Sequence, residues 1–286
     1  MVADIIERLA RRHVLVVGDI VLDEYLIGTA SRISREAPVP VLEYSERRLI
    51  AGGAANPSVN IMRLGSQAHQ VAVVGADDAG DQLRDVLSSH AIDTAAVVTD
   101  PARATTVKTR LMAQMGFRFP QQVARLDRVN REPIAPDISR LLADTALAKA
   151  DRIDALLFSD YHAGLLTADL VKALVGGLRE THPDIILTAD AQGELAKYAG
   201  LTLVKCNADD ARAYLQRDLQ SDDDFAEAAR TLYTELRLTG GMVITRGADG
   251  ATLATAESLS APDLSVHVPA PSVTDVYDTV GAGDTA

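Results

Sequence analysis

The amino-acid sequence predicts an α/β fold in which helices cover both faces of a mostly parallel sheet. Two observations support this class. Short, continuous apolar runs recur along the chain, and segments with a helical repeat separate them, which is the alternation that parallel α/β sheets require. With 286 residues, 47% of them hydrophobic, the chain has the length of one α/β domain with a small appendage, and it can build a sizeable core.

The expected strands are short runs of apolar residues. A strand that is buried on both faces shows such a run rather than an alternation of polar and apolar residues. The first run ends at Gly18 and the second at Gly75. The runs span residues 14–17, 71–74, 155–158, 185–187, 201–204 and 242–244. Cys206, the single cysteine, follows the fifth run, so we expect a buried and unreactive thiol.

Helical patterns occupy most of the intervals between these runs. Pro57 stands at the start of the first, where the first turn of a helix tolerates proline. The expected helices span residues 57–64, 81–89, 138–149, 168–180 and 225–236.

Two regions, about residues 24–50 and 105–126, lack a helical repeat and alternate polar with apolar residues instead. Alternation is typical of strands with one exposed face. We therefore expect a small β lid, built by two separate excursions of antiparallel strands outside the main sheet. The alternative is a pair of irregular surface loops.

The charge balance restricts the partners of the chain. A net charge of −12 and a pI of about 4.9 do not suggest nucleic acid binding and should repel anionic membranes. An anionic substrate therefore needs a local basic pocket. The sequence has no apolar run of about 18 residues that could cross a membrane, and its first residues lack the apolar run of a signal peptide. We expect a cytoplasmic protein with no membrane partner.

The most specific motif lies at the C-terminus and reads Asp278-Thr-Val-Gly-Ala-Gly-Asp284. A Gly-Ala-Gly turn lets backbone amides point inward without obstruction by side chains. If a helix begins there, its N-terminus offers unpaired N–H groups to a phosphate and to the charge that develops on it. Asp284 would then lie close enough to accept the proton of an attacking hydroxyl. The alternative is a loop with an N-cap aspartate.

Two glycine-rich segments follow or precede regular elements. Thr245, Gly247 and Gly250 belong to a turn directly after the strand at 242–244, where ligands of parallel sheets bind. An ordinary hairpin turn is the alternative. Gly52 and Gly53 precede Asn56, so the backbone could approach a ligand closely while the asparagine bonds to sugar hydroxyls. Here the alternative is an Asn56 N-cap with Pro57 in the first helical position.

A fourth motif, Gly18-Asp-Ile-Val-Leu-Asp23, follows the first strand. Aspartates such as Asp19 and Asp23 commonly orient a sugar through its hydroxyl groups. Other nucleotide-binding classes are disfavoured, because the sequence has neither a P-loop string nor a Gly-x-Gly-x-x-Gly after the first strand. The six histidines are scattered without zinc-ligand spacing.

Together these motifs resemble those of the ribokinase-like (PfkB-type) carbohydrate kinases, and the resemblance covers essentially the whole chain. Residues 52–56 and 278–284 match the two signatures of that family. Within the family the chain is most similar to the heptose-7-phosphate kinases, which often form the N-terminal half of a bifunctional heptose kinase/adenylyltransferase. The strings that carry this closer likeness lie at residues 18–23, 31–41, 52–56, 125–127 and 159–161.

The resemblance implies a three-layer α/β sandwich with a mostly parallel central sheet, formed by one kinase domain over residues 1–286. The β lid would form a clasp between two subunits of a homodimer. The implied reaction transfers the γ-phosphate of ATP to a sugar phosphate, with Mg²⁺ and, in many members of the family, a monovalent cation such as K⁺. The implied acceptor is the anomeric hydroxyl of D-glycero-β-D-manno-heptose 7-phosphate, a precursor of ADP-heptose and of the lipopolysaccharide core.

The resemblance also assigns roles to individual residues. Asp284 would be the catalytic base, and the amides of Gly281, Ala282 and Gly283 would stabilise the transferring phosphoryl group. ATP would bind at Asn207, Thr245, Gly247, Gly250 and Asp278, with Asp210 at the metal. The sugar would bind at Asp19, Asp23, Gly52, Gly53 and Asn56.

The chain departs from the family pattern at three positions. Asp210 stands where the family usually has glutamate, and Ala163 and Gln192 stand where the heptose kinases tend to have lysine. The remaining candidates to bind a sugar phosphate are Lys108, Arg110 and Arg125, and the alternative for these three is surface salt bridges. Two further hypotheses follow: a PfkB-type kinase for a different sugar, or an inactive sugar-binding or dimerisation module, because only two residues follow Asp284.

Overall fold

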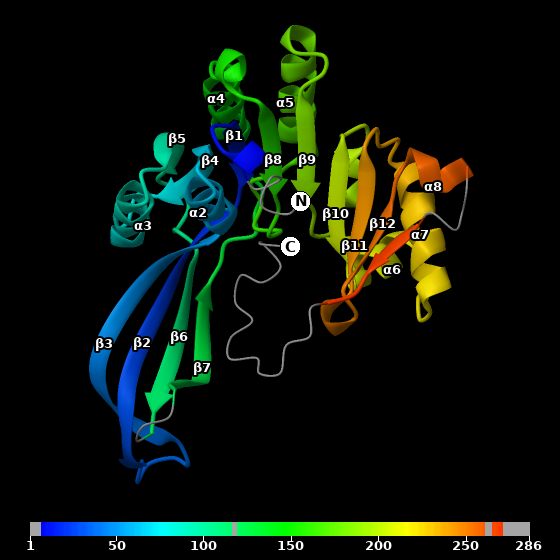
Figure 1. Cartoon of the computed structure of the whole chain (residues 1–286). Coiled ribbons are helices and arrows are strands. Elements are labelled where there is room, and N and C mark those ends of the chain that lie inside the picture. Colours follow the sequence, from blue (N-terminus) through cyan, green and yellow to red (C-terminus); the bar gives the residue numbers. More distant parts are fainter. Residues whose placement is uncertain (1–6, 116–118, 261–264, 271–286) are drawn as a thin grey trace.

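The computed structural model describes residues 7–115, 119–260 and 265–270, whose strands form two sheets (Figure 1). The central sheet has nine strands in these described ranges. Their spatial order is β13 (Val266–Val268), β12 (Ala251–Ala254), β11 (Gly241–Thr245), β10 (Leu203–Asn207), β9 (Ile186–Asp190), β8 (Ala155–Ser159), β1 (His13–Gly18), β4 (Gln67–Gly75) and β5 (Asp93–Asp100).

The strands from β11 to β5 all pair in parallel, and only β12 and β13 join antiparallel at one edge. This confirms the predicted mostly parallel sheet. Four of the six expected apolar runs lie within a strand, and the fourth and fifth, which begin one and two residues early, overlap the starts of β9 and β10. β5 and β13 were not predicted. β5 contains an apolar run at residues 95–98, so the sequence did carry a signal for it, whereas β13 is a three-residue edge strand with exposed side chains and shows no such run.

Helices pack around the central sheet (Figure 1), as a three-layer fold requires. The predicted ones are α2 (Ala55–Arg63), α3 (Asp78–Ser89), α4 (Pro136–Leu147), α5 (Ala168–Thr181) and α7 (Asp222–Glu235). Two short helices, α6 (Ala208–Leu215) and α8 (Ala256–Ser260), were missed, because each buries a single residue and so lacks an apolar stripe.

Polar caps explain why two helices begin earlier than the apolar pattern predicts. The Asp77 side chain accepts a hydrogen bond from the amide of Gly80, which starts α3 three residues before the predicted position. Ser221 and Asp224 form a capping box that starts α7 at Asp222. Capping residues are polar, so an apolar repeat identifies the helix but not its first turn.

A second sheet of four long strands extends away from the core and forms the lid (Figure 1). Its strands are β3 (Pro40–Gly53), β2 (Ile20–Ile33), β6 (Val107–Gln114) and β7 (Gln121–Arg128), in that order. The predicted lid is therefore confirmed, and the alternative of two irregular loops is wrong. One detail was also wrong: β2 and β6 pair in parallel, while only β2–β3 and β6–β7 are antiparallel.

The core contains one continuous apolar cluster that runs through the central sheet and its helices. Cys206 is fully buried there, and burial raises the pKa of its thiol well above the usual range, as expected of an unreactive core cysteine. Among the described helices, none is long and apolar enough to span a lipid bilayer.

Candidate functional site

The polar residues predicted to bind ligands gather at the carboxyl edge of the central sheet. Parallel strands end at the same edge, where α/β proteins bind ligands. In the register of the sheet, Gly18 at the end of β1 lies opposite Ser159 of β8, and Ser159 lies opposite Asp190 of β9. Further along the same edge, Asn207 of β10 lies opposite Thr245 of β11. Residues that are far apart in the sequence therefore meet at one edge, as the sequence predicts.

The lid begins at this edge and presents one face on which charged side chains are aligned. Lys108 of β6 lies between Asp23 of β2 and Asp127 of β7. Two residues further along β6, Arg110 lies opposite Arg125 of β7. Residues paired directly across a sheet lie on the same face, and so do residues two apart along a strand. Asp23, Lys108, Arg110 and Arg125 therefore share one face of the lid.

Asp23 and Arg110 form a buried ion pair at the base of this face. The Tyr25 ring lies 5.1 Å from the guanidinium carbon of Arg110 and gives it a second attractive contact. The surface salt-bridge alternative is wrong for Arg110, which is 6% exposed. Arg125 is exposed and pairs with Asp127 at 2.9 Å, so for this residue the alternative describes the geometry.

The two glycines before α2 give the backbone room beside the aspartates. A Cβ atom on Gly52 would lie 2.1 Å from Oδ2 of Asp23, and one on Gly53, where φ is +57°, would lie 2.3 Å from the carbonyl oxygen of Asp19. These positions therefore require glycine. The helix begins at Ala55 with Ala54 as its N-cap, so the alternative in which Asn56 is the N-cap is wrong. Asn56 lies inside the first turn.

Asp19 is buried and its carboxylate binds backbone amides. Oδ2 accepts hydrogen bonds from the amides of Tyr161 (3.2 Å) and Ala163 (3.1 Å), and Oδ1 accepts one from Leu165 (3.1 Å). Burial raises the pKa of Asp19 to about 6, with the nearby Asp160 adding to the effect and the amide bonds opposing it. The structure thus gives Asp19 a role in holding the segment 160–165, and its predicted sugar contact stays a prediction.

Asp160 forms the second buried cluster of this edge. It belongs to the string 159–161 that resembles the heptose kinases, but no role in the site was predicted for it. Its Oδ2 lies 2.8 Å from Nζ of Lys197 and accepts a 2.6 Å hydrogen bond from the hydroxyl of Tyr198. Its Oδ1 accepts the amide of His162 at 2.8 Å. Burial and the proximity of Asp160 raise the pKa of the Tyr198 hydroxyl well above its usual value.

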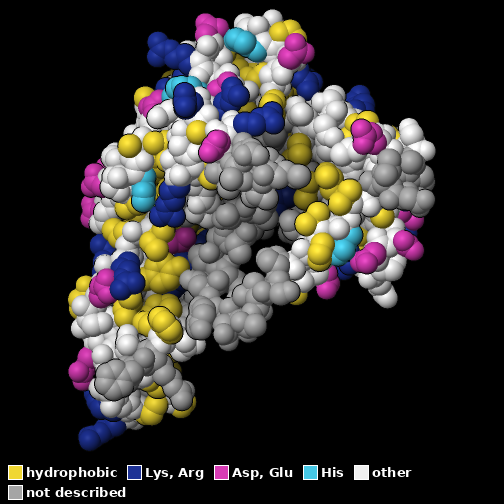
Figure 2. All heavy atoms as spheres, viewed as in Figure 1, with side chains coloured by type: hydrophobic (Ala, Val, Ile, Leu, Met, Phe, Trp, Pro, Cys, Tyr) yellow, Lys and Arg dark blue, Asp and Glu magenta, His cyan; other side chains and the backbone are white. Residues whose placement is uncertain are grey.

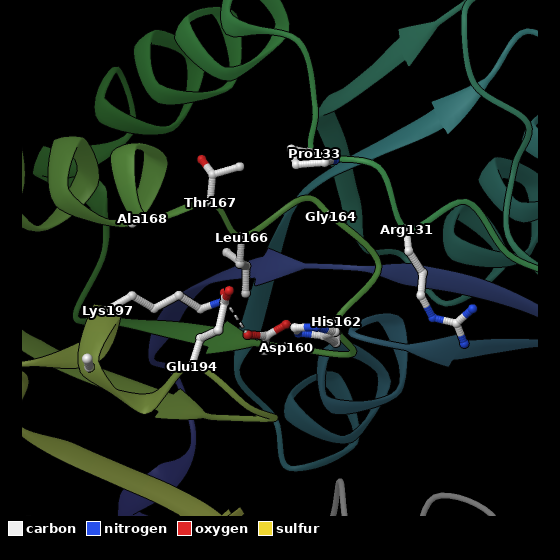
Figure 3. Close-up of a pocket in the computed structure, with 11 residues that line it drawn as sticks. Arg131, Pro133, Asp160, His162, Gly164, Leu166, Thr167, Ala168, Glu194 and Lys197 are labelled. Carbon is white, nitrogen blue, oxygen red and sulfur yellow. Dashed lines mark hydrogen bonds and ion pairs between the residues drawn. The ribbon is translucent and has the colours of Figure 1, made fainter. Parts of the chain in front are cut away.

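A cavity of about 730 Å³ opens beside Asp160 (Figure 3). Lys197 reaches towards Asp160 from one side of the cavity, His162 lies next to Asp160, and Arg131 stands on the far side. The start of α5, at Thr167 and Ala168, forms another wall.

The predicted metal residue, Asp210, fits a divalent cation. Its Oδ1 accepts the amide of Gly193 at 3.0 Å, whereas its buried Oδ2 has no hydrogen-bond partner among the described residues. Burial raises the pKa of Asp210, and backbone hydrogen bonds from Gly193 and Asn207 lower it. An orphaned buried carboxylate oxygen is costly unless a cation or a donor satisfies it.

No group of three potential metal-binding side chains occurs in the described ranges. That fits Mg²⁺, which proteins usually hold through one or two carboxylates together with phosphates and water. Asn207 caps α6 by accepting the amide of Asp210 at 2.8 Å. The same hydrogen bond fixes Asp210 relative to the end of β10.

The Thr245–Gly250 turn joins β11 to β12 as a hairpin, so the hairpin alternative is confirmed. The two glycines of this turn differ in the space that surrounds the Cβ position. A Cβ on Gly250 would lie 2.0 Å from the carbonyl oxygen of Val268, which excludes any side chain. Gly247, with φ of +61°, has open space around the Cβ position, so a ligand could approach its backbone closely.

Arg246 fastens this turn to α7. Its guanidinium lies 2.7 Å from Asp222 and 4.3 Å from the centre of the Phe225 ring.

The remaining predicted residues lie in the C-terminal motif, outside the described residues. These are Asp278, Gly281, Ala282, Gly283 and Asp284.

Comparisons with known proteins agree with this geometry. Residues 11–286 match the family described as pfkB family carbohydrate kinase. The chain is 36% identical over 274 residues to the bifunctional protein HldE of Geobacter sulfurreducens, covering 96% of the chain and 53% of that relative, and 32% identical over 274 residues to HldE of Helicobacter pylori, covering 96% and 56%. The chain therefore spans about half the length of the curated relatives it matches.

Solved structures show the same fold. Phosphofructokinase-2 from Escherichia coli, in complex with substrates and products, superposes with a TM-score of 0.70 at 22% identity, covering 96% of this chain and 83% of that one. Arabidopsis thaliana ribokinase, complexed with ribose and ATP, superposes with a TM-score of 0.67 at 13% identity and covers the same shares. The three-layer ribokinase-like sandwich predicted from the sequence is confirmed.

Proposed function

The chain belongs to the pfkB family of carbohydrate kinases, and on that premise we propose that it transfers the γ-phosphate of ATP to D-glycero-β-D-manno-heptose 7-phosphate. The curated relatives are HldE proteins, whose kinase half is the heptose 7-phosphate kinase. The acceptor atom would be the anomeric hydroxyl. We place the enzyme in the cytoplasm, where ATP is available.

One observation carries the choice of a phosphorylated acceptor. The lid face combines two carboxylates, Asp23 and Asp127, with the three cations Lys108, Arg110 and Arg125, so it keeps a net positive charge. A carboxylate accepts hydrogen bonds from sugar hydroxyls, and the cations attract a phosphate although the chain as a whole carries a charge of −12. Gly52 and Gly53 lie beside the two aspartates, and together with Asn56 they would border the same site.

The nucleotide would lie at the other end of the carboxyl edge. Asn207, Thr245, Gly247 and Gly250 would contact ATP, and the orphaned oxygen of Asp210 would bind Mg²⁺. When bound, Mg²⁺ neutralises charge on the phosphates of the nucleotide. A monovalent cation such as K⁺ may be tested in the same assays by exchanging it for Na⁺.

Catalysis would fall to the C-terminal motif. Asp284 would take the proton of the acceptor hydroxyl, the amides of Gly281, Ala282 and Gly283 would stabilise the phosphoryl group, and Asp278 would contact the nucleotide. Phosphoryl transfer depends mainly on such positioning and charge stabilisation. We expect Asp284→Asn to abolish phosphotransfer while calorimetry still detects binding of the sugar phosphate. Retained turnover would rule out this role.

We further propose that two lids pair to form a homodimer. The lid exposes large apolar side chains, among them Tyr44, Phe119 and Leu126, each at least 70% exposed. Figure 2 shows hydrophobic side chains along the lid, at the lower left of the view. Such side chains are typical of interfaces. Light scattering should give a dimer mass for the wild type and a monomer mass for Leu126→Asp, and a monomeric wild type would contradict the pairing.

A second acceptor is possible within the same family, because Ala163 and Gln192 replace two lysines that the heptose kinases tend to carry. A panel of sugars and sugar phosphates separates the two candidates. Turnover that is highest with the heptose 7-phosphate supports the first. Turnover with fructose or ribose derivatives and none with the heptose phosphate supports the second.

A further inference from the structure

The loop at residues 160–165 depends on two buried carboxylates for its shape. Asp19 accepts the amides of Tyr161, Ala163 and Leu165, and Asp160 accepts the amide of His162. Four backbone amides of this loop thus donate hydrogen bonds to side chains, and not to the backbone of a strand or a helix. Loop amides at the end of a buried strand need such partners, because an unpaired buried donor is costly.

Packing does not replace these hydrogen bonds on the outer side of the loop. The 730 Å³ cavity lies against Asp160, His162 and Gly164 (Figure 3). Where a cavity adjoins a loop, few side-chain contacts restrict it from that side. The buried Leu165 and Leu166 fix the end of the loop. Before them, the carbonyl groups of Ala163 and Gly164 accept hydrogen bonds from outside the loop, whereas the amides of residues 161–163 bind the two carboxylates.

The loop also connects the core to the lid. Tyr161 is the first residue of the loop whose amide binds Asp19, and Nζ of Lys108 lies 5.8 Å from the centre of its ring. A cation at this distance from an aromatic face is attracted to it. Lys108 is paired with Asp23 across β2 and β6, so the position of Tyr161 bears directly on the lid face that would bind the acceptor.

We propose that Asp19 is a positioning residue and not a sugar ligand: its carboxylate holds loop 160–165 so that Tyr161 supports Lys108 at the acceptor site. Because the acceptor site itself is part of the proposed function, the inference rests on that function. Three hydrogen bonds use most of the acceptor sites of the Asp19 carboxylate, and the residue is buried, which leaves the carboxylate poorly placed to bind a hydroxyl as well.

The charge state of Asp19 therefore matters to the loop. Protonation would turn one acceptor oxygen into a donor that faces backbone N–H groups. The charged and titratable groups around the carboxylate are Asp160, which opposes its ionisation, Lys197, which favours it, and Tyr198. With a pKa of about 6, Asp19 is mainly ionised at neutral pH and changes state in mildly acidic solution.

Two variants and two readouts test the inference. Asp19→Asn removes the charge at constant shape, and Asp154→Asn is the matched control: Asp154 also accepts a backbone amide, that of His13 at 2.7 Å, but at the opposite edge of the sheet. Hydrogen–deuterium exchange of the peptide covering residues 160–166 reports the loop, and steady-state kinetics report the acceptor.

For Asp19→Asn we expect faster exchange of this peptide, and a KM for the sugar phosphate that rises about tenfold, the equivalent of one lost hydrogen bond of ordinary strength. The kcat and the KM for ATP should change less. In the wild type the acceptor KM should rise below pH 6, and in Asp19→Asn it should be flat. Asp154→Asn should match the wild type in every readout.

Tyr161→Leu keeps the clamp but removes the ring, so it covers the case in which Asp19→Asn does not fold. It should raise the acceptor KM while the loop stays as protected as in the wild type. A raised KM with unchanged exchange in Asp19→Asn would identify a sugar ligand and overturn the inference, as would wild-type values in both readouts. If the wild type phosphorylates no sugar phosphate, the proposed function fails, and the exchange data still decide whether Asp19 holds the loop.

Discussion

Replacing Lys197 by methionine should destabilise the protein by about 3 kcal/mol, because it leaves a buried carboxylate without its cation. Nζ of Lys197 lies 2.8 Å from Oδ2 of Asp160, and the two side chains are 5% and 1% exposed. Removing one partner of a buried pair costs about 3–5 kcal/mol. We take the lower end, since the hydroxyl of Tyr198 and the amide of His162 still donate to Asp160.

Chemical denaturation of four proteins measures this effect: the wild type, Lys197→Met, Asp160→Asn and the double variant. The double variant has no buried charge to compensate, so it should be more stable than the sum of the single changes predicts by about 1–3 kcal/mol. Lys172→Met, on the exposed side of α5, is the control and should stay within about 0.5 kcal/mol of the wild type. A Lys197→Met variant as stable as this control would refute the reasoning, and so would strict additivity.

Three further predictions concern the site. Asp210→Asn should raise the Mg²⁺ concentration that gives half-maximal activity at least about tenfold, and an unchanged Mg²⁺ titration would exclude Asp210 as a ligand. Gly52→Ala should lower stability by about 1–3 kcal/mol in urea unfolding, because its Cβ would meet Oδ2 of Asp23 at 2.1 Å; an unaffected protein would contradict the close approach. The folded-state pKa of Asp19, about 6, lies above its ordinary value of 3.8, so the folded state binds the proton more tightly. The wild type should therefore lose about 2 kcal/mol relative to Asp19→Asn as pH rises from 4 to 7, and an opposite slope would refute the assignment.

The regular elements could be predicted because their signals are local. A strand such as β1 or β8, buried on both faces, shows its apolar run directly in the sequence. Errors arose where the deciding contact is distant: β2 pairs in parallel with β6, about 85 residues later in the chain, as the Thr109–Glu24 hydrogen bond reflects. Alternation predicts a strand but does not determine its neighbour.

The candidate site likewise has residues that could be predicted from the sequence and contacts that could not. The sequence predicted site residues after apolar strands, and the structure has Asn207 at the end of β10, Asp210 in the first turn of α6 and Asp23 at the base of the lid. It did not reveal that Asp19 binds amides about 145 residues away, or that Lys197 neutralises Asp160. Such partners depend on burial and on the path of the loop 160–165, which only the folded chain defines.

Phosphorylation of the acceptor is the most direct test of the central claim. The chain is incubated with ATP, Mg²⁺ and D-glycero-β-D-manno-heptose 7-phosphate, ADP is measured, and ³¹P NMR follows the sugar. We predict one equivalent of ADP for each new phosphate on the anomeric carbon. Absence of ADP with this acceptor and with every other sugar and sugar phosphate of the panel would contradict the account.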